Sequence, residues 1–199
     1  MKRILLVRHG ESEWNAARRL QGQADIGLSP KGEQQARAMR DVIASLRPDH
    51  IITSDLARAR RTAALLGYPD ALPDPTMREV HVGDWTGEAI ADLVAAGAED
   101  YRGWRAGTFT PPGGEVWSAF CDRVAAGVEK ALEQTQERLL VVCHGAVVRA
   151  LLDRLVGLPP SRILPVAPAS LTVLARRELV TRLEVFNYSG AELTFDAPD

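Results

Sequence analysis

The sequence of 199 residues predicts an α/β fold whose sheet is parallel where strands and helices alternate. Two observations support this. Short apolar runs alternate with stretches of helical periodicity, which is typical of parallel sheets. Two of the apolar runs also end abruptly in the dipeptide His-Gly, at His9-Gly10 and His144-Gly145. Ligands bind outside the carboxyl ends of strands in open α/β sheets, so both dipeptides lie where chemistry is expected.

The first third of the chain carries the clearest alternation. Residues 4–7 form an apolar run that predicts a buried strand, and a loop is expected at 16–27. Ser29 offers an N-cap before Pro30, which predicts a helix extending to about residue 46. A short strand at 51–53 and a helix at 54–66 complete a βαβα pattern.

The rest of the chain predicts further strands and helices. A connection with a short strand at 67–77 is followed by a helix at 88–96 and a less regular lid at about 97–114. Next come an amphipathic helix at 115–132, a buried strand at 139–143 and a helix at 146–156. Two antiparallel strands follow at 171–175 and 183–186, joined near Glu178. No repeat or linker divides these elements, so we expect residues 1–199 to form a single domain.

Composition narrows the class of protein. A hydrophobic fraction of 46% and a charged fraction of 25% are ordinary for a globular domain. The net charge of -2 offers no general attraction for nucleic acid or an anionic membrane, so we expect neither as a partner. The first residues lack the pattern of a signal peptide, and Cys121 and Cys143 have no metal or disulfide spacing. A cytoplasmic location is expected, with both cysteines in the core.

Charged or polar side chains follow three of the predicted strands. Arg8 and His9 follow the first, Ser54 and Arg58 the second, and His144 the strand at 139–143. A parallel sheet places these groups at one edge, where the guanidiniums suit the oxygens of a phosphate group. Histidine can act as a nucleophile toward phosphorus. The pattern therefore indicates a phosphoryl-transfer site.

A leaving alkoxide needs a proton, and Glu79 is the best candidate acid because a partly buried carboxyl can hold a proton near neutrality. Each of these residues also has a simpler interpretation. Arg58 lies in a basic run typical of a solvated helix face, and His144 fits a buried core histidine. Glu79 fits an ion pair with Arg78 or the cap of a turn. The histidines could also bind metal, although the chain shows no ligand spacing that favours it.

Six segments together resemble the histidine phosphatase superfamily, the phosphoglycerate mutase-like proteins. They are, in family order, residues 6–15, Gln21-Gly22 with Asp25, residues 53–59, residues 79–87, residues 112–115, and Cys143-His144-Gly145 with Arg149. The resemblance implies a three-layer α/β/α sandwich around a mostly parallel sheet, with an inserted lid at about 97–114. It implies no metal or organic cofactor.

The resemblance also implies roles for individual residues. His9 would be the phosphorylated nucleophile and Glu79 the proton donor. Arg8, Arg58 and His144 would form the phosphate pocket. The remaining residues implied to contact the substrate are Asn15, Gln21, Gly22 and Gly145.

Two valines favour hydrolysis over transfer to a second substrate oxygen. In mutases of this family, the segment that begins with the acid is similar to Glu-Arg-His-Tyr-Gly. This chain has Val80 and Val82 in place of the arginine and the tyrosine. Valine cannot bind a substrate carboxylate. We therefore expect a phosphatase acting on a small phosphomonoester, with a cofactor-dependent phosphoglycerate mutase as the alternative and a non-catalytic phospho-ligand binding module as a third.

Two further expectations concern substrate and assembly. The aromatic side chains Trp85, Trp104, Phe109 and Trp117 suggest an apolar wall and a phosphate carried on an apolar or sugar-like group. Residues 171–186 could supply a sheet edge, so a homodimer is expected.

Overall fold

Six strands form one sheet in the computed structural model, which describes residues 1–190. The strands are ordered β3-β2-β4-β1-β5-β6. The parallel part consists of β1 (Lys2–Arg8), β2 (His50–Thr53), β3 (Leu72–Pro73) and β4 (Arg138–Cys143). The antiparallel edge consists of β5 (Leu171–Arg177) and β6 (Val180–Tyr188). The predicted fold class is confirmed, whereas residues 191–199 of the predicted domain lie outside the described residues.

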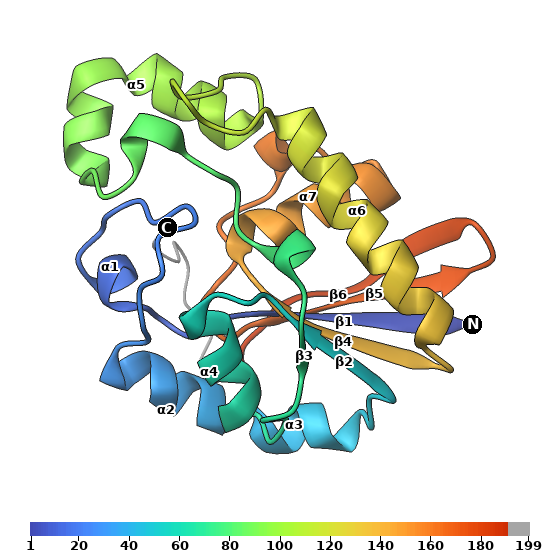
Figure 1. The fold of residues 1–199 in the computed structure, drawn as a ribbon. Coiled ribbons are helices and arrows are strands. Elements are labelled where there is room, and N and C mark those ends of the chain that lie inside the picture. The colour runs from blue at the N-terminus through green and yellow to red at the C-terminus, as the bar shows by residue number, and fades with distance from the viewer. Residues whose placement is uncertain (191–199) are drawn as a thin grey trace.

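Helices cover both faces of the sheet (Figure 1). On one face lie α2 (Pro30–Ala38), α3 (Arg40–Ser45) and α4 (Ala57–Leu65). On the other lie α6 (Trp117–Gln134) and α7 (Gly145–Val156). The helix α5 (Ile90–Ala106) lies to one side of these layers, toward the carboxyl ends of the parallel strands (Figure 1). Short turns of helix complete the chain: α1 (Glu13–Ala16), η1 (Pro75–Met77), η2 (Gly83–Trp85) and η3 (Pro160–Arg162).

Alternate side chains of β1 enter two separate cores. Ile4 and Leu6 pack with residues of α6 and α7, whereas Leu5 and Val7 pack with Met39, which lies between α2 and α3, and with residues of α3 and α4. Successive side chains of a strand point to opposite faces, so a central strand buried on both faces is apolar throughout. This explains why residues 4–7 carry no polar residue, and it anchors Arg8 and His9 to a rigid base.

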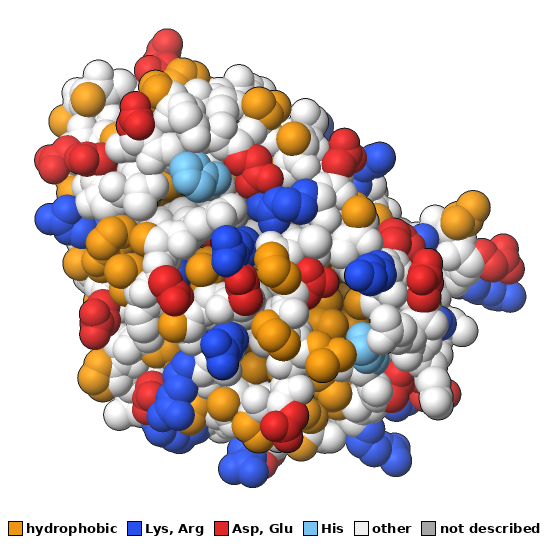
Figure 2. Space-filling view, in the orientation of Figure 1, with side chains coloured by type: hydrophobic (Ala, Val, Ile, Leu, Met, Phe, Trp, Pro, Cys, Tyr) orange, Lys and Arg blue, Asp and Glu red, His pale blue; other side chains and the backbone are white. Residues whose placement is uncertain are grey.

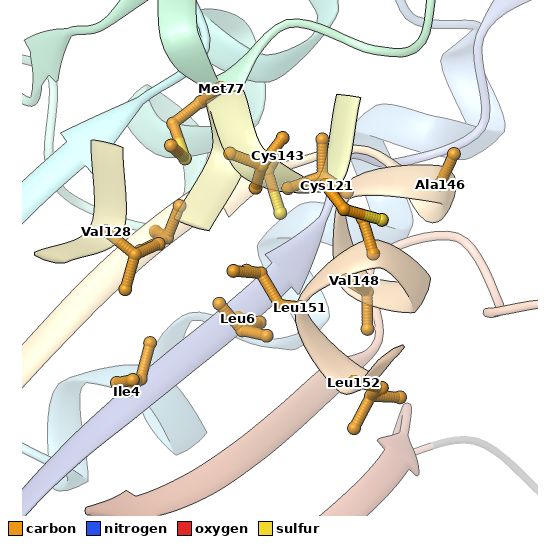
Figure 3. Packing of buried hydrophobic residues seen from close by; sticks show 14 of the residues in the cluster. Ile4, Leu6, Met77, Cys121, Val128, Cys143, Ala146, Val148, Leu151 and Leu152 are labelled. Carbon is orange, nitrogen blue, oxygen red and sulfur yellow. The ribbon is translucent and has the colours of Figure 1, made fainter. Parts of the chain in front are cut away.

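The two cysteines are buried, as predicted. Both lie in the core shared with α6 and α7, where Figure 3 shows them near Met77 and Ala146. Burial raises the pKa of the Cys143 thiol and raises that of Cys121 to about 12. Both side chains therefore remain protonated thiols and act as small apolar groups.

Several predicted boundaries are wrong, including those of three helical segments. The helix expected up to residue 46 is interrupted at Met39 and forms α2 and α3. The helix expected from Ser54 begins at Ala57, because the amide of Ser54 still donates to Val142 and extends the sheet ladder. The segment 97–106, expected to be part of a less regular lid, belongs to α5, in which Gly97 alone leaves helical geometry (φ -169°, ψ 78°).

The outer surface mixes both signs of charge. Figure 2 shows acidic and basic side chains interspersed on the face that it presents. The edge strand β6 exposes apolar side chains, among them Phe186 and Tyr188. Whether this edge pairs with a second chain stays a prediction. Within residues 1–190, no helix combines the length and apolar character needed to cross a membrane.

Candidate active site

The carboxyl ends of three neighbouring parallel strands bring the predicted residues together. Arg8 pairs with Cys143 in the sheet register, so His9 and His144 follow adjacent strands. Their ring centroids are 5.1 Å apart. The next strand, β2, ends beside β4 and places Ser54 against His144.

The environment of His9 sets its tautomer. Its Nδ1 lies 2.6 Å from the carbonyl oxygen of Gly10, which can only accept, so Nδ1 carries the proton. The lone pair of the neutral ring is therefore on Nε2. Only 2% of the residue is exposed. Burial, followed by the charges of Arg58 and Arg8, lowers the pKa of His9 well below its usual value. The imidazole is thus neutral and nucleophilic at neutral pH.

His144 carries its proton on the other nitrogen. Arg58 donates from Nε to His144 Nδ1 at 3.3 Å, so Nδ1 holds the lone pair. The Nε2 atom then donates to Ser54 Oγ at 2.8 Å. The residue is 0% exposed, and burial together with Arg58 lowers its pKa as well. His144 does not line the cavity, but it accepts a hydrogen bond from Arg58, which does.

Arg58 is held by backbone carbonyls at the base of the site. It is 0% exposed and donates to Ala24 O at 2.7 Å and to Gly22 O at 2.8 Å. Burial lowers its pKa to about 10, so the guanidinium stays charged at neutral pH. The solvated helix face considered for this run holds for its neighbours Arg60 and Arg61 and is wrong for Arg58. The second guanidinium, that of Arg8, donates to Val166 O.

Glu79 lies at the amino end of α7. Its Oε2 accepts from the amide of Ala146 at 3.2 Å, and its Oε1 accepts from Val80 at 2.9 Å. The alternative pairing with Arg78 is wrong, because Arg78 binds the carboxylate of Asp55 instead. The Glu79 carboxyl is therefore directed into the site.

The loop after β1 positions two further predicted residues. Ser12 caps α1 through the amide of Asn15, and the Asn15 side chain accepts from the Ser12 amide in return. The Ser12 hydroxyl also donates to Gln21 Oε1 at 2.8 Å. These bonds hold Asn15 and Gln21 on the rim of the cavity.

One cavity, open to solvent, joins these groups. It is lined by every predicted site residue except His144, including Gly22 and Gly145. The wall also contains residues for which no site role is expected from the sequence: Arg19, Arg105, Arg149, and apolar residues such as Leu20, Ile90, Pro165 and Val166. For Arg149 a signal existed, since it follows Gly145 by one helical turn. Arg19 and Arg105 had none.

A family model for the histidine phosphatase superfamily (branch 1) matches residues 4–189. The chain belongs to the histidine phosphatase superfamily. It is 40% identical over 169 residues to a probable phosphoglycerate mutase GpmB of Salmonella paratyphi C (strain RKS4594), covering 80% of this chain and 77% of the relative. It also resembles the solved structure of mycobacterial glucosyl-3-phosphoglycerate phosphatase complexed with VO3, with 32% identity, a TM-score of 0.88, and coverage of 95% and 100% of the two chains.

The apolar wall of the cavity differs from the predicted one. Trp104 lines the cavity, together with Val80 and Val82. The prediction is wrong for Trp85 and Phe109, which stack on each other with centroids 5.6 Å apart. It is also wrong for Trp117, which packs against Phe120 outside the cavity. Among residues 1–190, no group of three or more His, Cys, Asp or Glu side chains is arranged to hold a metal ion.

Proposed function

We propose that this chain hydrolyses small phosphomonoesters through a phosphohistidine intermediate on His9. The observation that carries the proposal is the orientation of His9, whose Nδ1 contacts Gly10 O while Arg8 and Arg58 line the same cavity. The two guanidiniums supply charge for the oxygens of a phosphoryl group, and Nε2 supplies the lone pair.

In the first step, His9 Nε2 attacks phosphorus and an N–P bond forms as the ester P–O bond breaks. The electron pair of the broken bond leaves with the alkoxide. Glu79 gives that oxygen a proton, so the product is a neutral alcohol. The position of Glu79, between the cavity and the first amides of α7, suits this transfer.

In the second step, water attacks the phosphorus of the phosphohistidine. The now ionised Glu79 takes a proton from the water, and the N–P bond breaks with its electron pair returning to Nε2. Inorganic phosphate leaves and His9 is neutral again. The proposed steps use side chains of this chain alone, so the rate is expected to be the same with and without EDTA.

The mutase alternative has a specific observation in its favour, the 40% identity to a probable phosphoglycerate mutase. Against it, Val80 and Val82 are buried in the wall of the cavity and offer no group to bind a carboxylate. Incubation with 3-phosphoglycerate and a trace of bisphosphoglycerate separates the two. We expect release of inorganic phosphate. Rapid conversion to 2-phosphoglycerate without phosphate release would establish the mutase instead.

The intermediate is tested by mixing the enzyme with an aryl phosphate and quenching in alkali, which preserves a phosphorus–nitrogen bond. We expect one acid-labile phosphate per chain, mapped by mass spectrometry to His9. Ligand binding with neither turnover nor labelling would favour the non-catalytic binding module.

A further inference from the structure

The side chain of Glu79 is carried by a segment without regular structure. Residues 78–82 lie between η1 and η2, outside every helix and strand of the fold. A group that transfers a proton must be held within about 0.5 Å of its productive position. Other parts of the chain therefore have to fix this acid segment, which we define as residues 76–82.

Residues 112–115, one of the segments that resemble the family, run beside the acid segment. The amide of Glu115 donates to His81 O at 2.8 Å, and the amide of His81 donates in return to Glu115 Oε2 at 3.3 Å. An added Cβ on Gly114 would lie 3.1 Å from His81 O, so this close approach favours glycine. Glu115 thus fixes the chain two residues after Glu79.

Arg123, in α6, binds both oxygens of the Glu115 carboxylate. Its Nε donates to Oε1 at 2.8 Å, and its Nη2 donates to Oε2 at 2.7 Å. The two side chains are only 24% and 19% exposed, and the guanidinium carbon lies 5.0 Å from the ring centroid of Phe120. A paired, partly buried contact of this kind is better defined in geometry than an ion pair on the open surface.

The Arg123 guanidinium also holds the chain before Glu79. Its Nη1 donates to the carbonyl oxygens of Thr76 at 2.7 Å and of Arg78 at 3.2 Å. The backbone of α6 comes close here as well, because an added Cβ on Gly127 would lie 2.1 Å from Thr76 Oγ1. The ion pair therefore holds the backbone on both sides of Glu79.

We propose that Arg123 and Glu115 are positioning residues, which hold the Glu79 carboxyl where it protonates the leaving group. The inference rests on the proposed function, in which Glu79 is the acid. It extends that function to two side chains that do not line the cavity and need not touch the substrate. They act through the backbone of the acid segment.

Two leaving groups test the positioning role. An alkyl phosphate needs protonation of its alkoxide, whereas a nitrophenyl phosphate leaves as a stable anion. Arg123→Met removes every bond that the guanidinium donates, so the acid segment can shift. In single-turnover experiments, we expect phosphorylation of His9 by the alkyl phosphate to slow about 10- to 30-fold, and phosphorylation by the nitrophenyl phosphate to slow less than about 3-fold.

Two milder variants keep the test valid if Arg123→Met does not fold, which its thermal midpoint will show. Glu115→Gln removes the charge that pairs with Arg123 and should show the same selectivity on a smaller scale. Arg123→Lys keeps the positive charge without the planar fork, so it should recover part of the rate with the alkyl phosphate. An equal loss for both esters in the folded variants would show a structural role only and overturn the inference.

The matched control is Arg154→Met. It removes another arginine that binds a carboxylate of α6, since Arg154 Nε donates to Asp122 Oδ1 at 2.9 Å. We expect the control to react with both esters at the rates of the unaltered protein. A selective loss in the control as well would mean that the effect is not particular to the acid segment.

A double variant separates this inference from the proposed function. Once Glu79→Gln has removed the acid, adding Arg123→Met should change the rate with the alkyl phosphate by less than about 3-fold, because the two changes act on one step. A further loss of about 10-fold would overturn the positioning role. If Glu79→Gln is selective for the alkyl phosphate and Arg123→Met is not, only the inference fails. If Glu79→Gln is not selective, the acid role fails and the inference falls with it.

Discussion

The two His-Gly strand ends share a dipeptide and one edge of the sheet, yet their imidazoles carry the proton on opposite nitrogens. His9 donates from Nδ1 to the carbonyl of Gly10. His144 accepts at Nδ1 from Arg58 and donates from Nε2 to Ser54. The first ring lines the cavity, whereas the second reaches it through Arg58.

The difference teaches that the partner of Nδ1 decides what each histidine does. A carbonyl oxygen makes Nδ1 a donor and leaves Nε2 free to attack, whereas a guanidinium makes Nδ1 an acceptor and uses up the lone pair. In the proposed mechanism, His9 is the reacting group and His144 positions Arg58. The predictions below test this division.

The largest effect is expected at His9. His9→Ala should lower kcat by at least about 10⁴-fold and abolish the labelled intermediate, because the nucleophile is gone. His144→Ala should lower kcat by about 10²-fold and still form the phosphoenzyme. Rapid-quench labelling with an aryl phosphate measures both. Loss of labelling in both variants, with both still folded, would contradict the division.

Glu79→Gln is expected to have the next largest effect, and it depends on the leaving group. An alkyl phosphate needs protonation of its alkoxide, so its kcat should fall by about 10³-fold, within the range for general acid catalysis. A nitrophenyl phosphate leaves as a stable anion and should lose far less in the phosphorylation step. Single-turnover kinetics across a series of leaving groups checks this. A uniform loss would mean that Glu79 is not the acid.

Ser54→Ala should have a smaller effect, exerted through His144. The change removes the acceptor of the Nε2 proton and leaves a buried donor unpaired, which costs about 1–3 kcal/mol of unfolding free energy. The His144 ring can then turn and weaken its bond to Arg58. We expect about a 10-fold higher KM with a shifted pH profile. Ser54→Thr, which keeps the hydroxyl, should restore the profile, and a purely structural role would not produce this shift.

The last effect concerns stability against pH rather than catalysis. Burial and Arg58 lower the pKa of both histidines in the folded protein, whereas in the unfolded chain they titrate near about 6.5. The unfolded state then binds more protons below that pH. The free energy of unfolding should fall as pH decreases from about 7 to 5, by up to about 1.4 kcal/mol per pH unit for each histidine. Urea titrations should give a shallower slope for His9→Asn, and an unchanged slope would contradict this.

The strands and their chemistry could be predicted because apolar runs end sharply at polar residues. That signal is local, and it located Arg8, His9 and His144 at the sheet edge. The break at Met39 has no glycine or proline to mark it, and α5 continues through Gly97, where such a signal falsely suggested an end. The contact between Arg149 and Arg105 spans 44 positions. It depends on where α5 packs, so no local pattern contains it.

The buried charge of Arg58 has a thermodynamic consequence. Folding places this guanidinium where little water can solvate it, and a bound anion offsets part of that cost. Inorganic phosphate, the proposed product, should therefore raise the thermal midpoint and inhibit turnover with the same dissociation constant, since one equilibrium governs both. Product inhibition and stabilisation by phosphate would then both measure the free energy of phosphate binding. A variant that is no longer inhibited by phosphate should also show no rise of its thermal midpoint with phosphate.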